Sequence, residues 1–298
     1  MISNEPNDSE HLISYEEMSD GTPRSVSGEK CQTAQLPCAN GHNGIVIKIG
    51  GSTLGNHDTT LDDIVELQKF GEKICVVHGG GKTISEWMEK QGVRPKFTDG
   101  LRVTDAASLE IVVAVLTGVI NKNIVAAITS KGGRAVGLSG VDGGMVQAHV
   151  SNPKLGYVGD VDSINTSIID SAIEAGFIPV ISPIGYNNSP AEGDNFLLNI
   201  NADTVAGHIA HALKAARMVF MTDVSGVLDS SNRVIPRITK RQADSLVRSN
   251  IISGGMLPKI KGCLLASESG AVTQIIDGRE QGALRDALKD KINGTRIG

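Results

Sequence analysis

Residues 44–55 read GIVIKIGGSTLG, an apolar run that carries a lysine, Lys48, and ends in two glycines. Residues 73–82 read KICVVHGGGK and repeat the plan, with three glycines after the apolar run. A phosphate loop of the GxxxxGK[ST] type places its lysine after the glycines, whereas Lys48 comes before them. The two stretches therefore predict buried strands that end in turns where backbone N–H groups can approach an anion.

Apolar runs of this kind continue along the chain and indicate the fold class. They lack the strict alternation of a half-exposed sheet, and helical patterns separate them, as in a mainly parallel sheet that helices cover on both faces. The sequence therefore predicts an α/β fold whose ligands bind at the carboxyl ends of the strands. Further strands are expected at 135–140, 177–183, 195–200, 217–221, 271–276 and 294–297, a hairpin at 145–164, and helices at 60–70, 83–91, 104–131, 166–175, 202–214, 240–248, from 256 onward and at 280–289.

Residues 1–43 differ in composition from the rest of the 298-residue chain. They are polar, rich in Ser, Asn and Glu, and show no sustained hydrophobic periodicity. Such segments bury too little apolar surface to offset the entropy of ordering. We expect a mostly disordered extension here, with a docking segment as the alternative, and a folded domain over residues 44–298.

Composition and charge exclude several classes of function. The net charge of −5 argues against general affinity for nucleic acid or acidic membranes. No apolar run is expected to approach the ~18 residues of a membrane helix, and the first residues form no secretory signal. We therefore expect a cytoplasmic protein. The four cysteines, Cys31, Cys38, Cys75 and Cys263, have no metal-like spacing. Buried thiols are expected for Cys75, in an apolar strand, and Cys263, in an expected helix.

Four charged residues are candidates for binding or catalysis. Lys48 lies in an apolar strand, where an ammonium group is costly to bury without a negative partner. Arg102, in GLRVTD, is either solvated or a clamp for a ligand carboxylate. Asp203 and the two asparagines before it in NINAD, Asn199 and Asn201, either cap a helix or contact a substrate. Lys259, in GGMLPKIKG, lies at an expected helix start, where the helix dipole disfavours a cation, so it is either solvated or engaged by an anionic ligand.

A resemblance to the acetylglutamate kinases, within the amino-acid kinase family, rests on six segments taken together: VIKIGGS, VVHGGGK, FTDGLRVTD, NINADTVAG, FMTDVSGVLD and GGMLPKIKG. Their order and spacing extend the resemblance over nearly all of residues 44–298. It implies a three-layer αβα sandwich with a mostly parallel central sheet and two lobes that share a cleft. The lobe at 44–215 would bind the acid and form the dimer contact, and the lobe at 216–298 would bind the nucleotide.

The same resemblance implies a reaction and a role for individual residues. The γ-phosphoryl group of ATP would pass to the side-chain carboxylate of N-acetyl-L-glutamate, the second step of arginine synthesis. ATP would be a co-substrate that carries Mg²⁺, no residue is assigned as a metal ligand, and a homodimer is expected. Lys48 and Lys259 would contact the transferring phosphoryl group, and Asp203 would orient both lysines. The acid would be bound by Gly80, Gly81, Arg102 and Asn199, and the nucleotide by Gly50, Gly51, Asp223 and Gly226.

A carboxylate nucleophile is already ionised near pH 7, so this reaction needs no general base. His78 is accordingly expected to be a structural or substrate-edge residue. Two alternatives stay open. One is a kinase of a related acid, such as N-acetyl-aminoadipate, aspartate, carbamate or UMP, because one methylene group is worth only ~1–3 kcal/mol of discrimination. The other is a non-catalytic amino-acid or nucleotide sensor on the same fold, against which the joint presence of Lys48, Asp203 and Lys259 argues.

Overall fold

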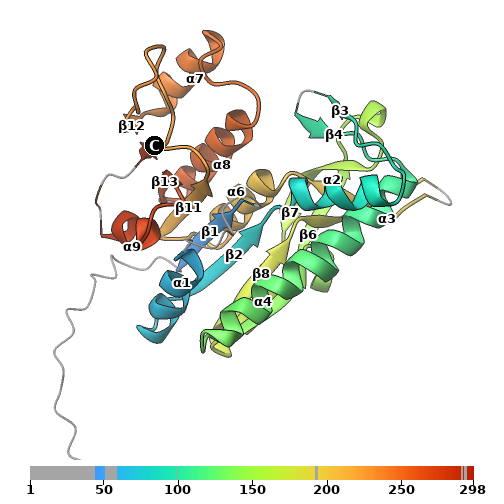
Figure 1. Ribbon diagram of the computed structural model, residues 1–298, viewed down its shortest axis with the longest axis horizontal. Coiled ribbons are helices and arrows are strands. Elements are labelled where there is room, and N and C mark those ends of the chain that lie inside the picture. The colour runs from blue at the N-terminus through green and yellow to red at the C-terminus, as the bar shows by residue number, and fades with distance from the viewer. Residues whose placement is uncertain (1–43, 51–58, 99, 192–193, 290, 292–293) are drawn as a thin grey trace, which may run out of the picture. The chain divides into compact units, whose positions relative to one another are not determined.

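The computed structural model describes residues 44–298 except 51–58, 99, 192–193, 290 and 292–293. Its main sheet has eight strands in the order β12-β14-β13-β11-β1-β2-β8-β5 (Figure 1). All neighbouring pairs are parallel except β13 with β14. The strands are β1 (Ile45–Ile49), β2 (Ile74–His78), β5 (Ala135–Ser139), β8 (Ile178–Ser182), β11 (Arg217–Thr222), β12 (Arg237–Ile238), β13 (Val272–Asp277) and β14 (Thr295–Ile297).

Helices cover both faces of this sheet, and the alternation of side chains along β1 shows how. Ile45, Ile47 and Ile49 point into one core cluster, which contains α1, α2, α3, α4 and α9, whereas Val46 points into a second cluster with α5, α6, α7 and α8. The predicted three-layer αβα arrangement with a mostly parallel sheet is confirmed. The helices are α1 (Thr60–Lys69), α2 (Gly81–Lys90), α3 (Ala106–Val113), α4 (Asn121–Ser130), α5 (Ser167–Glu174), α6 (Ala202–Ala212), α7 (Lys240–Arg248), α8 (Met256–Glu268) and α9 (Ala283–Leu288).

A second, small sheet closes into a barrel in the order β10-β7-β6-β9. The expected hairpin is present as the antiparallel pair β6 (Val146–Val150) and β7 (Val158–Ile164). β10 (Leu197–Ile200) matches an expected strand, but β9 (Ile184–Asn187) lies in a stretch expected to be a loop. The two-residue strands β3 (Phe97–Thr98) and β4 (Leu101–Arg102) were likewise not expected, because strands this short have no readable period.

A continuous helical run from Ala106 to Ser130 joins α3 and α4 through a π-helical segment, η1 (Ala114–Ile120). It is long enough to cross a membrane and has a mean hydropathy of 2.0 over an 18-residue window. The expectation that no apolar run approaches this length is therefore wrong. One side of the run packs into the core beside the sheet. Core helices of soluble proteins have the same length and composition, so these alone are weak evidence for a span.

Two domain boundaries were predicted from the sequence, one after residue 43 and one at residue 215. Residues 1–43, including Cys31 and Cys38, lie outside the described residues, so the extension stays a prediction. Cys75 and Cys263 are buried free thiols, as expected. β11 pairs with β1 and continues the same sheet across the proposed lobe boundary at residue 215, so the division into two lobes also stays a prediction.

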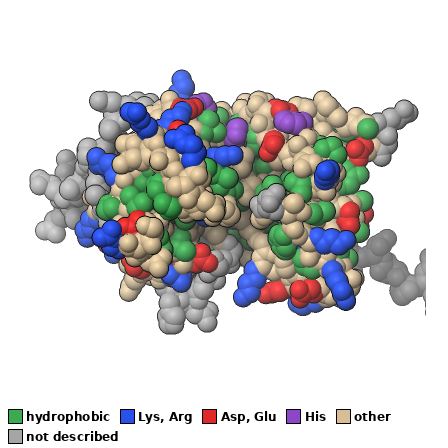
Figure 2. Space-filling model, turned by 90° about the horizontal axis from the view of Figure 1, so that it is seen from above, with side chains coloured by type: hydrophobic (Ala, Val, Ile, Leu, Met, Phe, Trp, Pro, Cys, Tyr) green, Lys and Arg blue, Asp and Glu red, His purple; other side chains and the backbone are tan. Residues whose placement is uncertain are grey.

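Charged side chains of both signs occur on the face of the molecule that Figure 2 shows. On the face shown in Figure 2, Lys and Arg lie among Asp and Glu, with hydrophobic and neutral side chains between them. Such a mixed surface is ordinary for a protein that presents no single-sign field to a partner.

Candidate active site

The glycine turns meet at one edge of the main sheet. β1 and β2 are parallel neighbours, with Ile49 opposite His78, so Gly50 and Gly79 both follow the carboxyl ends of adjacent strands. Side chains alternate along β1, and Lys48 therefore points to the same face as Val46, the face that carries α6 and α8. This places its ammonium group beside the N-terminal ends of those two helices.

Asp203 joins two lysines from distant parts of the chain. Its Oδ1 lies 2.6 Å from Lys48 Nζ in an ion pair, and its Oδ2 accepts a 2.8 Å hydrogen bond from Lys259 Nζ. The exposed fractions of the three side chains are 8% for Lys48, 7% for Asp203 and 19% for Lys259. The structure thus brings together all three residues expected to act on the phosphoryl group.

The charges of this cluster determine its resting state. Burial acts to raise the pKa of the Asp203 carboxyl, but the ammonium groups of Lys48 and Lys259 outweigh it and hold that pKa below its ordinary value. One carboxylate therefore faces two ammonium groups, and the cluster carries one positive charge beyond neutrality. This excess positive charge favours the binding of an anion, and the charged groups are in place before the ligand binds.

Close packing of α6 against α8 sets the distance between Asp203 and Lys259. A Cβ atom on Gly207 would lie 2.5 Å from Gly262 Cα, so the two helices touch through glycines. Asp203 lies one turn before Gly207 on α6, and Lys259 lies one turn before Gly262 on α8. The glycine pair is a structural determinant of the site that was not found in the sequence.

A cavity of about 240 Å³ opens beside the charged cluster. Gly80 precedes α2 and Gly81 begins it, so the free N–H groups of the helix N-terminus belong to the cavity wall. Six of the residues expected at the site line this cavity: Lys48, Gly80, Gly81, Arg102, Asn199 and Asp203.

Arg102, on β4, is held firmly at the cavity wall. Its NH2 donates to the Gly81 carbonyl and to Ser85 Oγ, both at 2.9 Å, and its guanidinium lies 4.7 Å from the centre of the Phe97 ring. NH1 donates to Met88 Sδ. These contacts tie the short β3–β4 hairpin to one side of α2. Ser85 was not found in the sequence, although it lies one helical turn after Gly81.

The two asparagines of NINAD differ in what they do. Asn201 caps α6, and its side chain accepts hydrogen bonds from the N–H groups of Asp203 and Thr204. Asn199 lines the cavity, and its Nδ2 donates to Thr104 Oγ1 at 3.1 Å. The capping interpretation therefore holds for Asn201, while Asn199 remains a binding candidate, with Thr104 as a partner that the sequence did not reveal.

The residues expected to bind the nucleotide lie on neighbouring strand ends. Gly50 follows β1, and Asp223 follows β11, the parallel neighbour of β1. Gly226, three residues after Asp223, is buried, with φ near +141°, and a Cβ there would lie 2.8 Å from Thr295 Oγ1. Packing against β14 therefore accounts for a glycine at this position. Gly51 lies outside the described residues.

His78 is buried behind the glycine turn and is not among the residues that line the cavity. Its Nδ1 donates to the Gly79 carbonyl at 3.0 Å. Burial, together with the charges of Lys48 and Lys122, lowers its pKa to about 4. The imidazole is neutral at physiological pH, which agrees with a structural rather than a catalytic role.

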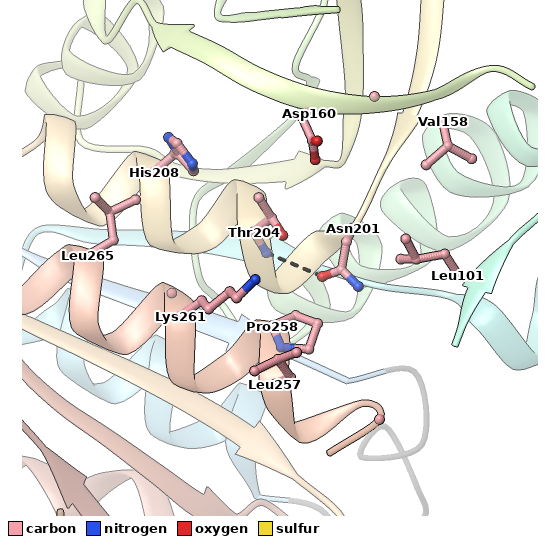
Figure 3. A pocket seen from close by; sticks show the side chains of 13 residues that line it. Leu101, Val158, Asp160, Asn201, Thr204, His208, Leu257, Pro258, Lys261 and Leu265 are labelled. Atoms are coloured by element: carbon pink, nitrogen blue, oxygen red, sulfur yellow. Dashed lines mark hydrogen bonds between the residues drawn. The ribbon is translucent and has the colours of Figure 1, made fainter. Parts of the chain in front are cut away.

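A second cavity, of about 330 Å³, adjoins the first and shares Leu101, Val158 and Asn201 with it. Figure 3 shows that it lies between β7, α6 and α8, with Asp160 and Lys261 extending toward α6 from opposite sides. Nothing in the sequence indicated this cavity. Residues of both α6 and α8 line the second cavity, and the first turn of α6 also lines the first.

A family model and several known proteins match this chain over most of its length. A model of the amino acid kinase family matches residues 43–277. The chain belongs to the amino acid kinase family. The acetylglutamate kinase of Dehalococcoides mccartyi is 42% identical to it over 254 residues, which cover 85% of this chain and 93% of that protein. The acetylglutamate kinase of Azorhizobium caulinodans is 40% identical over 271 residues, covering 85% and 88%.

A solved structure also matches this chain. The crystal structure of smu.665 from Streptococcus mutans matches this kinase with a TM-score of 0.72 and 32% identity, covering 85% of this chain and 97% of that one. The resemblance drawn from the six segments is confirmed, and the chain is an enzyme, a kinase. The alternative of a non-catalytic sensor is not supported.

Proposed function

We propose that this kinase transfers the γ-phosphoryl group of ATP to the side-chain carboxylate of N-acetyl-L-glutamate and forms N-acetylglutamyl 5-phosphate, the second step of arginine biosynthesis. The observation that carries the proposal is the cluster of Lys48, Asp203 and Lys259 beside a cavity walled by glycine amides and Arg102. The identity of 40–42% to acetylglutamate kinases selects the acid.

The chemistry requires compensation of negative charge rather than proton transfer. A carboxylate attacks a phosphate, and the transition state spreads charge over the equatorial oxygens of the transferring group. Lys48 and Lys259 would neutralise that charge from two sides, while Asp203 keeps both ammonium groups in place before the substrates bind. Because the donors are fixed in advance, little reorganisation is needed at the moment of reaction.

The acid would occupy the smaller cavity. Its volume of about 240 Å³ lies below the roughly 300–1,000 Å³ of sites for drug-sized ligands, as suits a small acid. The N–H groups at Gly80 and Gly81 would receive the reacting carboxylate, Arg102 the α-carboxylate, and Asn199 the acetylamino group. All four groups belong to elements fixed by the contacts described above.

ATP would approach from the adjoining strand ends. Gly50 and Gly51 would accommodate its phosphates, and Asp223 with the loop through Gly226 would hold the nucleotide. Mg²⁺ would arrive with the phosphates of ATP and add positive charge between them. We further propose that the enzyme works as a homodimer in the cytoplasm.

The activity itself is the first testable prediction. With Mg-ATP and hydroxylamine as the trap, N-acetylglutamate should give acyl hydroxamate far faster than glutamate, aspartate or carbamate. N-acetyl-aminoadipate should be slower by roughly 10-fold or more, since one extra methylene group costs ~1–3 kcal/mol. A clear preference for any other acid in the panel would overturn the assignment of the substrate.

Replacing Arg102 by lysine separates acid binding from nucleotide binding. Lysine keeps the charge but loses the planar fork that donates to Gly81 and Ser85. Loss of a charged hydrogen bond costs ~1.5–3 kcal/mol, so the KM for the acid should rise roughly 10-fold or more while the KM for ATP changes little. The matched control is Arg134→Lys, at an exposed arginine that also stacks on a phenylalanine, Phe177. Equal changes in both KM values would place Arg102 outside the acid site.

A further inference from the structure

We propose that Asn121 is a positioning residue that holds the acid-binding glycine turn, Gly79–Gly81, in place through His78. The inference rests on the proposed function, because it takes the turn to be the site of the acid. It assigns a role to a residue that contacts no substrate itself.

Asn121 is a buried polar residue at an unusual point of the fold. It begins α4 directly after the π-helical segment η1, and only 1% of it is exposed. Its Nδ2 lies 2.8 Å from the Val180 carbonyl, 3.3 Å from the Leu138 carbonyl and 3.2 Å from His78 Nε2. One amide group thus connects three neighbouring strands, β2, β8 and β5, at the edge where the glycine turn begins.

The hydrogen bond from Asn121 fixes the tautomer of His78. Because Nε2 accepts from the amide, the ring proton must lie on Nδ1, where it donates to the Gly79 carbonyl at 3.0 Å. The orientation of the peptide that follows Gly79 is thereby fixed, and this peptide supplies the N–H group of Gly80. Asn121 on α4 thus contacts His78, and His78 in turn contacts the peptide that supplies an amide of the acid site.

The π-helical segment supports the opposite side of the turn. A Cβ on Gly80 would lie 2.2 Å from Ile120 Cδ1 and 3.0 Å from Leu116 Cδ2, so the turn presses directly on η1. Leu116 also lines the acid cavity. Single turns of π-helix occur frequently at functional sites, and here η1 places Ile120 against Gly80 and Asn121 against His78. An apolar residue at position 121 could pack in the core but could not orient the imidazole.

The charges around His78 explain why an uncharged amide serves this purpose. The charged groups that face the ring are Lys48 on β1 and Lys122 on α4, and both oppose its protonation, as does its burial. Asn121 Oδ1 accepts a hydrogen bond from Lys122 Nζ at 3.1 Å. A carboxylate in place of the amide would reverse this balance and favour an imidazolium.

The variant Asn121→Asp tests the proposal, since it keeps the size of the side chain but removes its two N–H donors and adds a charge. The aspartate should raise the pKa of His78 into the range pH 5–8. Protonated His78 can donate from both nitrogens, to the aspartate and to the Gly79 carbonyl, so the turn is held at low pH. Neutral His78 would present a lone pair to a carboxylate, so the turn is released as pH rises.

The expected readout is therefore a KM for the acid that rises roughly 10-fold between pH 5.5 and 8 in Asn121→Asp, relative to the wild type over the same range. The KM for Mg-ATP should stay within about twofold, a split that general loss of stability would not produce. In the double variant His78→Gln, Asn121→Asp, this pH dependence should disappear because no imidazole remains to titrate. Asn123→Asp adds the same charge at an exposed position on the same helix and should behave as the wild type.

Two results would overturn the proposal: an acid KM in Asn121→Asp that equals the wild-type value at every pH, or a pH dependence that persists in the double variant. Should Asn121→Asp fail to fold, Asn121→Ser provides the test. It should raise the acid KM without new pH dependence, and equal rises in both KM values would contradict the proposal. Wild-type turnover is measured first on the acid panel, and the KM split is then measured for whichever acid reacts, so that a wrong substrate assignment and a wrong role for Asn121 give different outcomes.

Discussion

Lys48→Ala and Lys259→Ala should each lower kcat roughly 10²-fold or more while leaving both KM values within a few-fold. Each ammonium group meets the phosphoryl group mainly in the transition state, and an interaction of that kind lowers kcat rather than raising KM when it is removed. Loss of a single preorganised donor costs ~10²–10³ in kcat in other enzymes. Steady-state kinetics on purified variants gives both constants.

The structure makes the two lysines a coupled pair rather than independent donors. Both are held by the same carboxylate, Asp203, at 2.6 and 2.8 Å. Removing either lysine therefore also leaves the other with a less constrained partner, and the double variant should lose less than the product of the two single losses. Lys240→Ala is the control, because this exposed lysine pairs with Glu268 at the surface. Near-normal kcat in either single variant would show that its lysine had been given the wrong role.

The sequence was sufficient to predict the parts of this site that depend on strand order. Lys48 carries an ammonium group inside an apolar strand, and a buried ammonium group requires a negative partner in the folded protein. Glycines after two consecutive strands predict a shared edge if the strands are parallel neighbours, as β1 and β2 are. Helix starts with a capping residue, such as Asp105 before α3, also follow from local chemistry.

Contacts that depend on tertiary packing could not be predicted in this way. Nothing in the local sequence shows that Gly207 and Gly262 touch, although their contact sets the approach of α6 to α8. The partners of Asn121 come from three strands far away in sequence. The apolar run at 106–130 is broken in the sequence by Asn121 and Lys122, which suggests a shorter run. The helix nevertheless continues through both residues.

Asp203→Asn should be the most destabilising single substitution at the site. Removing one partner of a buried ion pair costs ~3–5 kcal/mol, because the remaining charge stays buried without compensation. Here two ammonium groups would be left facing each other across a neutral amide. Asp62→Asn is the matched control, since Asp62 forms a 2.7 Å ion pair with Lys131 but its side chain is 54% exposed. Its effect should stay within about 1 kcal/mol, as for other surface pairs.

The pH dependence of the stability lost in Asp203→Asn shows whether the ion pairs of Asp203 cause that loss. The pKa of Asp203 in the folded protein lies below its ordinary value, so the carboxylate stabilises the fold fully at pH values above the unfolded pKa of about 3.9. That contribution is lost as pH falls through the folded pKa. Free energies of unfolding from urea titrations should therefore differ by several kcal/mol between wild type and Asp203→Asn at pH 7, and the gap should narrow below about pH 4. A gap that is already absent at pH 7 would show that the three-residue cluster orients the lysines without stabilising the fold.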